Sequence, residues 1–211
     1  MDQLTKPGQI VILNGAPRSG KSSIVAAIQE TFEGLWMNLG VDVFVTQVTP
    51  KRYRPGMGLR PGEDGHRLAP LVPALYAAMY ESVAAHSRAG FNVVVDVGHH
   101  DRTVLADSAH RLVGLPVLFV GVRCPIEVIV ERRNAGQPGR EGEYLTASTS
   151  EIPAPILRWQ RDVHIPGIYD FEVDTSALSA AECAAAIRRR LDEGPPPSAF
   201  RRLAEGERAE D

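Results

Sequence analysis

The fold of this chain is decided by residues 10–23, which read Ile10-Val11-Ile12-Leu13-Asn14-Gly15-Ala16-Pro17-Arg18-Ser19-Gly20-Lys21-Ser22-Ser23. The stretch opens with a continuous apolar run, Ile10 to Leu13, which predicts a strand covered on both faces. It leads into a helical pattern that puts four apolar residues on one face: Ile24, Val25, Ile28 and Phe32. A buried strand, a glycine-containing loop and a helix in this order are typical of an α/β protein whose loop binds phosphate.

The loop of this stretch, Gly15 to Ser22, matches the pattern G-x-x-x-x-G-K-S, and we call it the phosphate loop. Successive backbone N–H groups in such a loop wrap a phosphate, and the following helix N-terminus adds positive potential. Lys21 is expected to reach the β- and γ-phosphates, and the Ser22 hydroxyl to ligate Mg²⁺. The pattern predicts that the chain binds a nucleoside triphosphate. It does not distinguish a kinase from a GTPase or an ATP-driven motor. The expected nucleotide-binding residues here are Gly15, Ala16, Pro17, Arg18, Ser19, Gly20, Lys21, Ser22 and Ser23.

Short apolar strands alternate with longer helical stretches along the rest of the chain. The expected strands are Ile10 to Leu13, Trp36 to Leu39, Val93 to Val95, Val117 to Val122 and Phe171 to Val173. Helical periodicity covers Val72 to Val83 and Val104 to Val113, and Ser179 with Glu182 forms a capping-box pattern before a further helix. Because parallel strands need crossover helices, this order predicts an α/β three-layer sandwich.

Composition excludes several classes of protein. Of the 211 residues, 44% are hydrophobic and 23% charged, with a formal net charge of −3, so the chain is neither disordered nor fibrous. A slightly acidic chain disfavours electrostatic binding of nucleic acid. No apolar run approaches the roughly 20 residues that span a bilayer. Cys124 and Cys183 are too far apart for a metal or disulfide framework, and we expect a reduced, cytoplasmic protein.

Two segments depart from the alternation of strands and helices. Thr49 to Leu68 is rich in proline, glycine and arginine and predicts an irregular insertion over one end of the sheet. Residues 194–211 begin with a triple proline and become charged, which predicts a flexible C-terminal tail with at most one short helical patch. We therefore expect one domain over residues 1–193, followed by a tail.

Two aspartates stand where expected strands end, at the edge of the sheet where ligands bind in open α/β folds. Asp42 follows Gly40-Val41 and has two interpretations. It is either the base that accepts a proton from a substrate hydroxyl, or the cap of a helix beginning near Val43. Asp96 closes the run Val93 to Val95 and resembles a carboxylate that holds Mg²⁺ directly or through water.

A polar segment follows the expected strand Val93 to Val95. Gly98-His99-His100-Asp101 has the composition of a metal cluster, but it lacks further spaced ligands. We interpret it as a polar loop at the rim of the site, with Asp101 capping the next helix.

The helix after Pro125 ends at Arg132-Arg133, and the loop beyond it contains Arg140. Phosphoryl-transfer enzymes use mobile arginines to stabilise developing charge, which makes Arg133 and Arg140 candidates for a lid.

Several segments together resemble the chloramphenicol phosphotransferases and their relatives among P-loop kinases. They are residues 10–23, Leu39 to Asp42, Arg88 to Asp96, Val120 to Cys124 and Tyr169 to Ser176. The resemblance implies a P-loop kinase fold with a five-stranded parallel sheet, which uses ATP and Mg²⁺ to phosphorylate a hydroxyl of a small molecule. It also implies that Asp42 is the catalytic base and that Asp174 and Thr175 lie near the adenine side of the nucleotide.

The resemblance is weakest where the acceptor should bind. Residues 43–75 match poorly and include the basic and aromatic run Lys51 to Arg54, and the arginines after Arg133 are sparse. Chloramphenicol is the leading named acceptor, with another hydroxylated compound as the nearest alternative. A nucleotide, sugar-nucleotide or RNA-end kinase, and a nucleotide-binding protein without catalysis, stay open. The sequence lacks the Asn-Lys-x-Asp signature of a GTPase and is compatible with a homo-oligomer.

Overall fold

Five parallel strands form the centre of the computed structural model, which describes residues 6–50, 53, 69–135, 152 and 154–206. They are β1 (Ile10–Asn14), β2 (Trp36–Asn38), β3 (Asn92–Val97), β4 (Val117–Arg123) and β5 (Phe171–Asp174). Their order in the sheet is β2-β3-β1-β4-β5, and every pairing is parallel. The predicted five-stranded parallel sheet is therefore confirmed, with each expected strand within three residues of its observed bounds.

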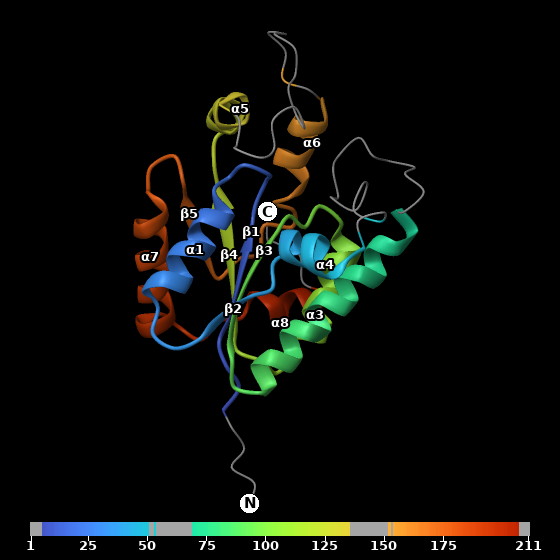
Figure 1. Ribbon diagram of the computed structural model, residues 1–211, viewed down its shortest axis with the longest axis vertical. Helices are drawn as coiled ribbons and strands as arrows, with labels where there is room; N and C mark the ends of the chain where they lie inside the picture. The colour runs from blue at the N-terminus through green and yellow to red at the C-terminus, as the bar shows by residue number, and fades with distance from the viewer. Residues whose placement is uncertain (1–5, 51–52, 54–68, 136–151, 153, 207–211) are drawn as a thin grey trace, which may run out of the picture.

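Helices cover both faces of the sheet, as the three-layer prediction requires (Figure 1). One face carries α1 (Lys21–Thr31) and α7 (Ala180–Glu193), and the other carries α3 (Val72–Arg88), α4 (Arg102–Arg111) and α8 (Ala199–Ala204). The alternation of side chains along each strand divides the core between the two faces. Ile10 and Ile12 of β1 join the cluster with α3, α4 and α8, whereas Val11 and Leu13 join the cluster with α1 and α7.

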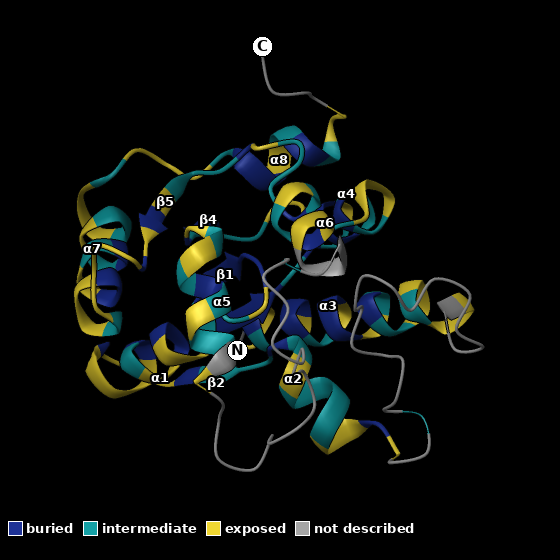
Figure 2. Ribbon diagram, turned by 90° about the horizontal axis from the view of Figure 1, so that it is seen from above, coloured by how far each residue is buried: buried dark blue, intermediate teal, exposed yellow. Residues whose placement is uncertain are grey.

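The remaining elements lie around the carboxyl ends of the strands. A single turn, α2 (Val41–Val43), continues into the π-helical η1 (Phe44–Val48), and the short η3 (Ala69–Leu71) precedes α3. Helices α5 (Ile126–Asn134) and α6 (Ala154–Asp162) lie over the same end of the sheet (Figure 2). The predicted insertion is described only at Thr49, Pro50 and Tyr53, and its other residues lie outside the described ones. In the part of the chain that is described, no helix has the length and apolarity needed to cross a membrane.

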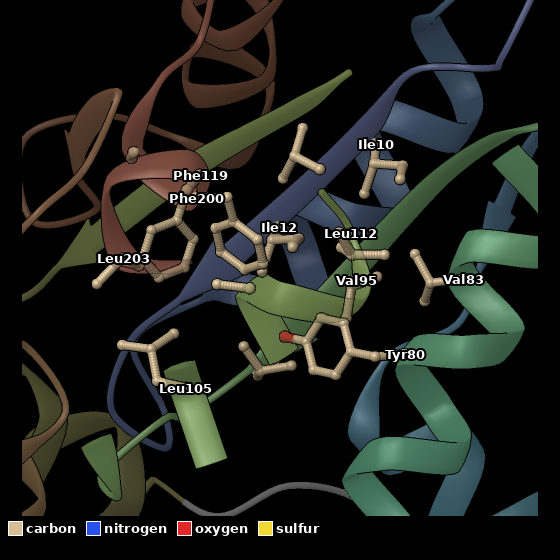
Figure 3. Packing of buried hydrophobic residues seen from close by; sticks show 14 of the residues in the cluster. Ile10, Ile12, Tyr80, Val83, Val95, Leu105, Leu112, Phe119, Phe200 and Leu203 are labelled. Atoms are coloured by element: carbon tan, nitrogen blue, oxygen red, sulfur yellow. The ribbon is translucent and has the colours of Figure 1, made fainter. Parts of the chain in front are cut away.

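The prediction of a flexible tail from residue 194 is wrong for its described part. Residues 199–204 form α8, and Phe200 and Leu203 are buried with exposures of 4% and 6% (Figure 3). The Phe200 ring packs edge-on against Phe119 of β4, with ring centroids 4.9 Å apart. The Asp170 carboxylate accepts hydrogen bonds from the backbone N–H groups of residues 198 and 199, at 2.6 and 2.9 Å, and so holds the start of the helix. Residues 207–211 lie outside the described ones.

Candidate active site

The phosphate loop joins β1 directly to α1, as its sequence predicts. A Cβ atom at Gly15 would lie 2.6 Å from the Val122 carbonyl oxygen, so only glycine fits there. Gly20 has a φ of 90°, and Arg18, which is not a glycine, has a φ of 69°. Left-handed residues within a tight turn point successive N–H groups toward one concave side, which suits an anion.

Lys21 lies between the phosphate loop and two carboxylates. Its Nζ atom donates hydrogen bonds of 2.8 Å to the carbonyl oxygens of Gly15 and Ala16. Burial lowers the pKa of Lys21 to about 8, while the charges of Asp96 and Asp42 act in the opposite direction. Both aspartates singled out from the sequence are therefore close enough to Lys21 to act on its charge.

The side-chain oxygens of Ser22 and Asp96 lie together, next to Lys21. The Ser22 hydroxyl donates a 2.8 Å hydrogen bond to Oδ2 of Asp96, whose side chain is buried at the end of β3. Gly40 leaves room for this carboxylate, since a Cβ atom at Gly40 would overlap Oδ1 of Asp96. A hydroxyl and a carboxylate oxygen are both ligands that Mg²⁺ prefers. Among the described residues, no group of three or more His, Cys, Asp and Glu side chains could hold a metal.

Asp42 does not act as a helix cap. The cap of α2 is Gly40, and Asp42 lies inside the first turn with its side chain exposed. The helix-cap interpretation of Asp42 is therefore wrong. Its charge helps to raise the pKa of Tyr76 and opposes the fall in the pKa of Lys21, so the carboxylate lies within electrostatic reach of both side chains.

An apolar pocket begins at Val41, the residue before Asp42. Residues from α2, η1 and α3 line it: Val41, Phe44, Val45, Val72, Leu75, Tyr76 and Met79. Tyr76 is the only one of them with a polar group on its side chain, and burial together with the Asp42 charge raises its pKa. The residues expected to form an acceptor site thus build an apolar surface beside the candidate base.

Arg132, one residue before the predicted Arg133, lies at the phosphate loop. Its guanidinium donates to the backbone oxygen of Thr175 at 2.6 Å and to the Thr175 hydroxyl at 3.0 Å. It also reaches the Arg18 carbonyl oxygen, at 3.5 Å. All of these partners are neutral, so they leave the guanidinium charge available to an anion. Helical spacing from the buried Ile129 fits both Arg132 and Arg133, so the sequence could indicate the pair but not which of the two reaches the loop.

Of the two strand-end residues predicted to lie near the nucleotide, Thr175 contacts the phosphate loop. Thr175 is buried, and its hydroxyl donates a 2.8 Å hydrogen bond to the Ser19 carbonyl oxygen. The Asp174 carboxylate instead accepts hydrogen bonds from the hydroxyl and backbone N–H of Ser176, which lower its pKa. Arg133 is half-buried on α5, and Arg140 lies outside the described residues.

The polar loop after β3 is only partly at the rim of the site. Asp101 caps α4 as predicted, because its carboxylate accepts hydrogen bonds from the backbone N–H groups of Thr103 and Val104. His99, by contrast, is buried behind Tyr76, and one ring nitrogen lies 2.7 Å from the Tyr80 hydroxyl. Burial lowers the pKa of His99 to about 3, so it is neutral at pH 7.

Helix α6 is anchored on the phosphate loop. Trp159 and Val163 pack with Ala16 of the loop and with Cys124 and Ile129. The Trp159 ring also fills the space over Gly98, where a Cβ atom would lie 2.7 Å from it. The elements on either side of the expected lid are therefore fixed against the loop that would bind phosphate.

A phosphate loop between a buried strand and a helix, with a serine and an aspartate paired beside its lysine, is an arrangement that P-loop phosphotransferases use. Residues 8–192 match the family described as chloramphenicol phosphotransferase-like protein. The chain belongs to this family, as its sequence motifs predict, and the predictions of the fold and of a phosphotransferase enzyme are confirmed.

A relative supports membership of this family, and solved structures share the fold. The chain is 26% identical to the Mycobacterium tuberculosis H37Rv protein named "Putative O-phosphotransferase Rv2636", covering 93% of this chain and 88% of that protein. The fold of this chain is similar to that of a Janibacter sugar kinase. The two are 20% identical, with a TM-score of 0.60, and the match covers 90% of this chain and 97% of the kinase. It is also similar to the Deinococcus radiodurans tunicamycin resistance protein, with 16% identity, a TM-score of 0.57, and coverage of 88% and 96%.

Proposed function

We propose that the protein is an ATP-dependent O-phosphotransferase that moves the γ-phosphoryl group of ATP to a hydroxyl of a largely apolar small molecule. The observation that carries this proposal is that the charges of Asp96 and Asp42 both act on Lys21, while Val41, the residue before Asp42, lines the apolar pocket. Such an arrangement would set the base between the phosphate site and the acceptor site. Chloramphenicol, an aromatic compound with a primary hydroxyl, is the first candidate acceptor.

On this proposal, the nucleotide binds along residues 15–23 and reaches the strand ends at Asp174 and Thr175. Ser22 and Asp96 would hold Mg²⁺, because their oxygens already lie 2.8 Å apart at the start of α1. The ion neutralises phosphate charge when bound. Arg132 and Lys21 add fixed positive charge beside the same phosphates. Arg133 and Arg140 stay candidates for the lid.

The proposed transfer uses Asp42 as the base. The carboxylate accepts the proton of the acceptor hydroxyl and orients its oxygen toward the γ-phosphorus. A bond forms between that oxygen and the phosphorus, and the bond to the β–γ bridging oxygen breaks. ADP leaves with the bonding electron pair, and Lys21 stabilises the charge that develops on its phosphates.

The lining of the pocket favours this function over the alternatives. A nucleotide, sugar-nucleotide or RNA-end acceptor would bring phosphates, which need basic or polar partners, next to aliphatic side chains. Of the run Lys51 to Arg54, only Tyr53 is among the described residues. A binding protein without catalysis would have no use for a carboxylate between the phosphate loop and a pocket.

A panel assay tests the proposal. Protein, Mg²⁺ and γ-labelled ATP are incubated with chloramphenicol, other aromatic and aliphatic alcohols, sugars, nucleosides and a 5′-hydroxyl RNA, and products are identified by mass spectrometry. We expect phosphate on a hydroxyl of one of the apolar compounds, and none with the Lys21→Ala variant. Transfer confined to sugars, nucleosides or RNA would contradict the proposed acceptor class.

A further inference from the structure

His164 follows α6 and lies near the phosphate loop without belonging to any motif of the sequence. It is half-buried, and its ring meets the Tyr169 ring edge-on with centroids 5.8 Å apart. Burial and the charges of Arg123 and Lys21 lower the pKa of His164 to about 4. The ring is therefore neutral at pH 7 and carries one N–H donor and one acceptor nitrogen.

Asn14 determines which way the neighbouring hydrogen bonds run. Its Oδ1 atom lies 2.8 Å from the backbone N–H of His99, and its Nδ2 atom lies 2.8 Å from the backbone oxygen of Val163. A backbone N–H only donates and a backbone oxygen only accepts, so these two contacts fix the orientation of the amide. Nδ2 must then also donate to the Tyr169 hydroxyl oxygen, at 2.8 Å.

The Tyr169 hydroxyl has one proton left to donate. His164 Nδ1 lies 2.8 Å from the hydroxyl oxygen, whereas the Val163 backbone oxygen lies 3.5 Å away, at the limit of a hydrogen bond. The proton therefore goes to Nδ1, which becomes the acceptor. The imidazole proton then resides on Nε2, which has no hydrogen-bond partner in the described part of the chain.

We propose that the Nε2–H group of His164 donates a hydrogen bond to an oxygen of the terminal phosphate of ATP. This inference rests on the proposed function, because it requires a nucleoside triphosphate in the phosphate loop. The terminal phosphate is the group that Lys21 is expected to reach. The His164 ring is joined through the Tyr169 hydroxyl to Asn14, the residue that directly precedes the phosphate loop. His164 follows Val163, whose side chain packs with Ala16 of the loop.

On this proposal Asn14 and Tyr169 are positioning residues, since they act on the nucleotide only through His164. A donor held by such a chain does not have to reorient when charge develops on the phosphate, which is how preorganised groups stabilise a transition state.

Paired substitutions test the donor. In His164→Gln the side-chain amide nitrogen takes the place of Nε2, whereas in His164→Asn the amide takes the place of Nδ1 and the donor is lost. Binding of ADP and of the non-hydrolysable analogue AMPPNP, each with Mg²⁺, is measured by calorimetry. A hydrogen bond to a charged group is worth enough that His164→Asn should bind AMPPNP roughly tenfold more weakly. It should bind ADP like the wild type, and His164→Gln should recover most of the loss.

Equal weakening of ADP and AMPPNP, or no weakening of either, would overturn the inference while leaving the proposed function intact. Failure of the wild type to bind either nucleotide would instead refute the proposed function. The variants must unfold at the wild-type temperature, so that a loss of binding is not a loss of fold.

The tautomer can be observed directly. The chain has six histidines, and the ¹⁵N imidazole resonances of His164 are identified by their absence in His164→Asn. We expect the Nε2-protonated neutral form at pH 7, and loss of that preference in Tyr169→Phe. A charged ring, or a proton on Nδ1, would contradict the inference.

Discussion

The two faces of the sheet are built differently. On one face, α1 and α7 pack over a core beside the phosphate loop, whose backbone and Lys21 are the groups proposed to bind the nucleotide. On the other face, α2, η1 and α3 present side chains to the pocket, and α4 and α8 support α3 from behind. Backbone geometry can serve any nucleotide, whereas side chains select an acceptor. On the proposed function, specificity for the acceptor resides on the second face, which includes the residues that resemble the family least.

The nucleotide face should be the more sensitive to a single substitution. Lys21→Ala removes the lysine of the phosphate loop, and the loss of such preorganised charge costs about 10²- to 10³-fold in turnover. We expect transfer to fall at least that far, with weaker ATP binding. Single-turnover assays measure this, with Lys6→Ala as the matched control because Lys6 is exposed and remote from the loop. Wild-type turnover in a folded Lys21→Ala protein would contradict the phosphate-loop assignment.

The acceptor face should be the more sensitive to loss of its supporting helix. Phe200→Ala removes a buried ring that contacts Phe119 and Tyr80, and such substitutions cost about 3–5 kcal/mol of unfolding free energy. Denaturant unfolding measures the loss. Arg201→Ala on the same helix exposes nothing new and should stay within about 0.5 kcal/mol of the wild type. A stable Phe200→Ala protein would mean that α8 does not support this face.

A polar group in the pocket should affect only the acceptor. Leu75→Gln keeps the size of the side chain but puts an amide into the apolar lining, which costs about 1–3 kcal/mol where it stays unpaired. We expect the KM for the acceptor to rise roughly tenfold while the Kd for ATP is unchanged. Leu191→Gln on α7, packed in the opposite core, serves as the control. If Leu75→Gln weakened ATP binding and acceptor binding alike, the two faces would not be functionally separate.

The smallest expected effect is a proton taken up with ATP. Without nucleotide, burial holds the pKa of Lys21 at about 8, below the 10.5 of an exposed lysine. Between these values the unfolded chain keeps the proton and the folded chain has lost it, so this group makes stability rise with pH in that window. Bound phosphates favour the charged lysine, so at pH 9 ATP should bind with uptake of up to one proton. Calorimetry in two buffers of different ionisation enthalpy detects this, and binding by Lys21→Met should lack it.

Features set by local sequence could be predicted. The phosphate loop, the five strands and the Ser179–Glu182 capping box depend on residues close together in the chain, and all are observed where expected. The burial of helix α8 was not predicted, because its two large buried side chains, Phe200 and Leu203, stand in a short charged segment that follows three prolines. Arg132 and Arg133 differ by one step around a helix, and only the packing of α5 shows which one reaches the loop.

Contacts between distant segments could not be predicted. Asn14, His164 and Tyr169 are brought together at the carboxyl edge of the sheet, and no periodicity or spacing connects them. The pocket has the same origin, since α2, η1 and α3 are separated by residues 51–68, most of which match no pattern. The sequence could predict where Asp42 stands in the chain but not that it borders an apolar surface.

The central claim is that Asp42 couples the two faces as the base for the acceptor hydroxyl. Asp42→Asn keeps the shape of the side chain and removes its charge and basicity. The decisive measurement is the single-turnover rate of transfer beside an ATP titration, on protein with an unchanged melting temperature. General bases contribute about 10²- to 10⁴-fold, so we expect the rate to fall by that factor while the Kd for ATP changes by no more than a few-fold. An unchanged rate, or a loss of ATP binding equal to the loss of transfer, would contradict the claim.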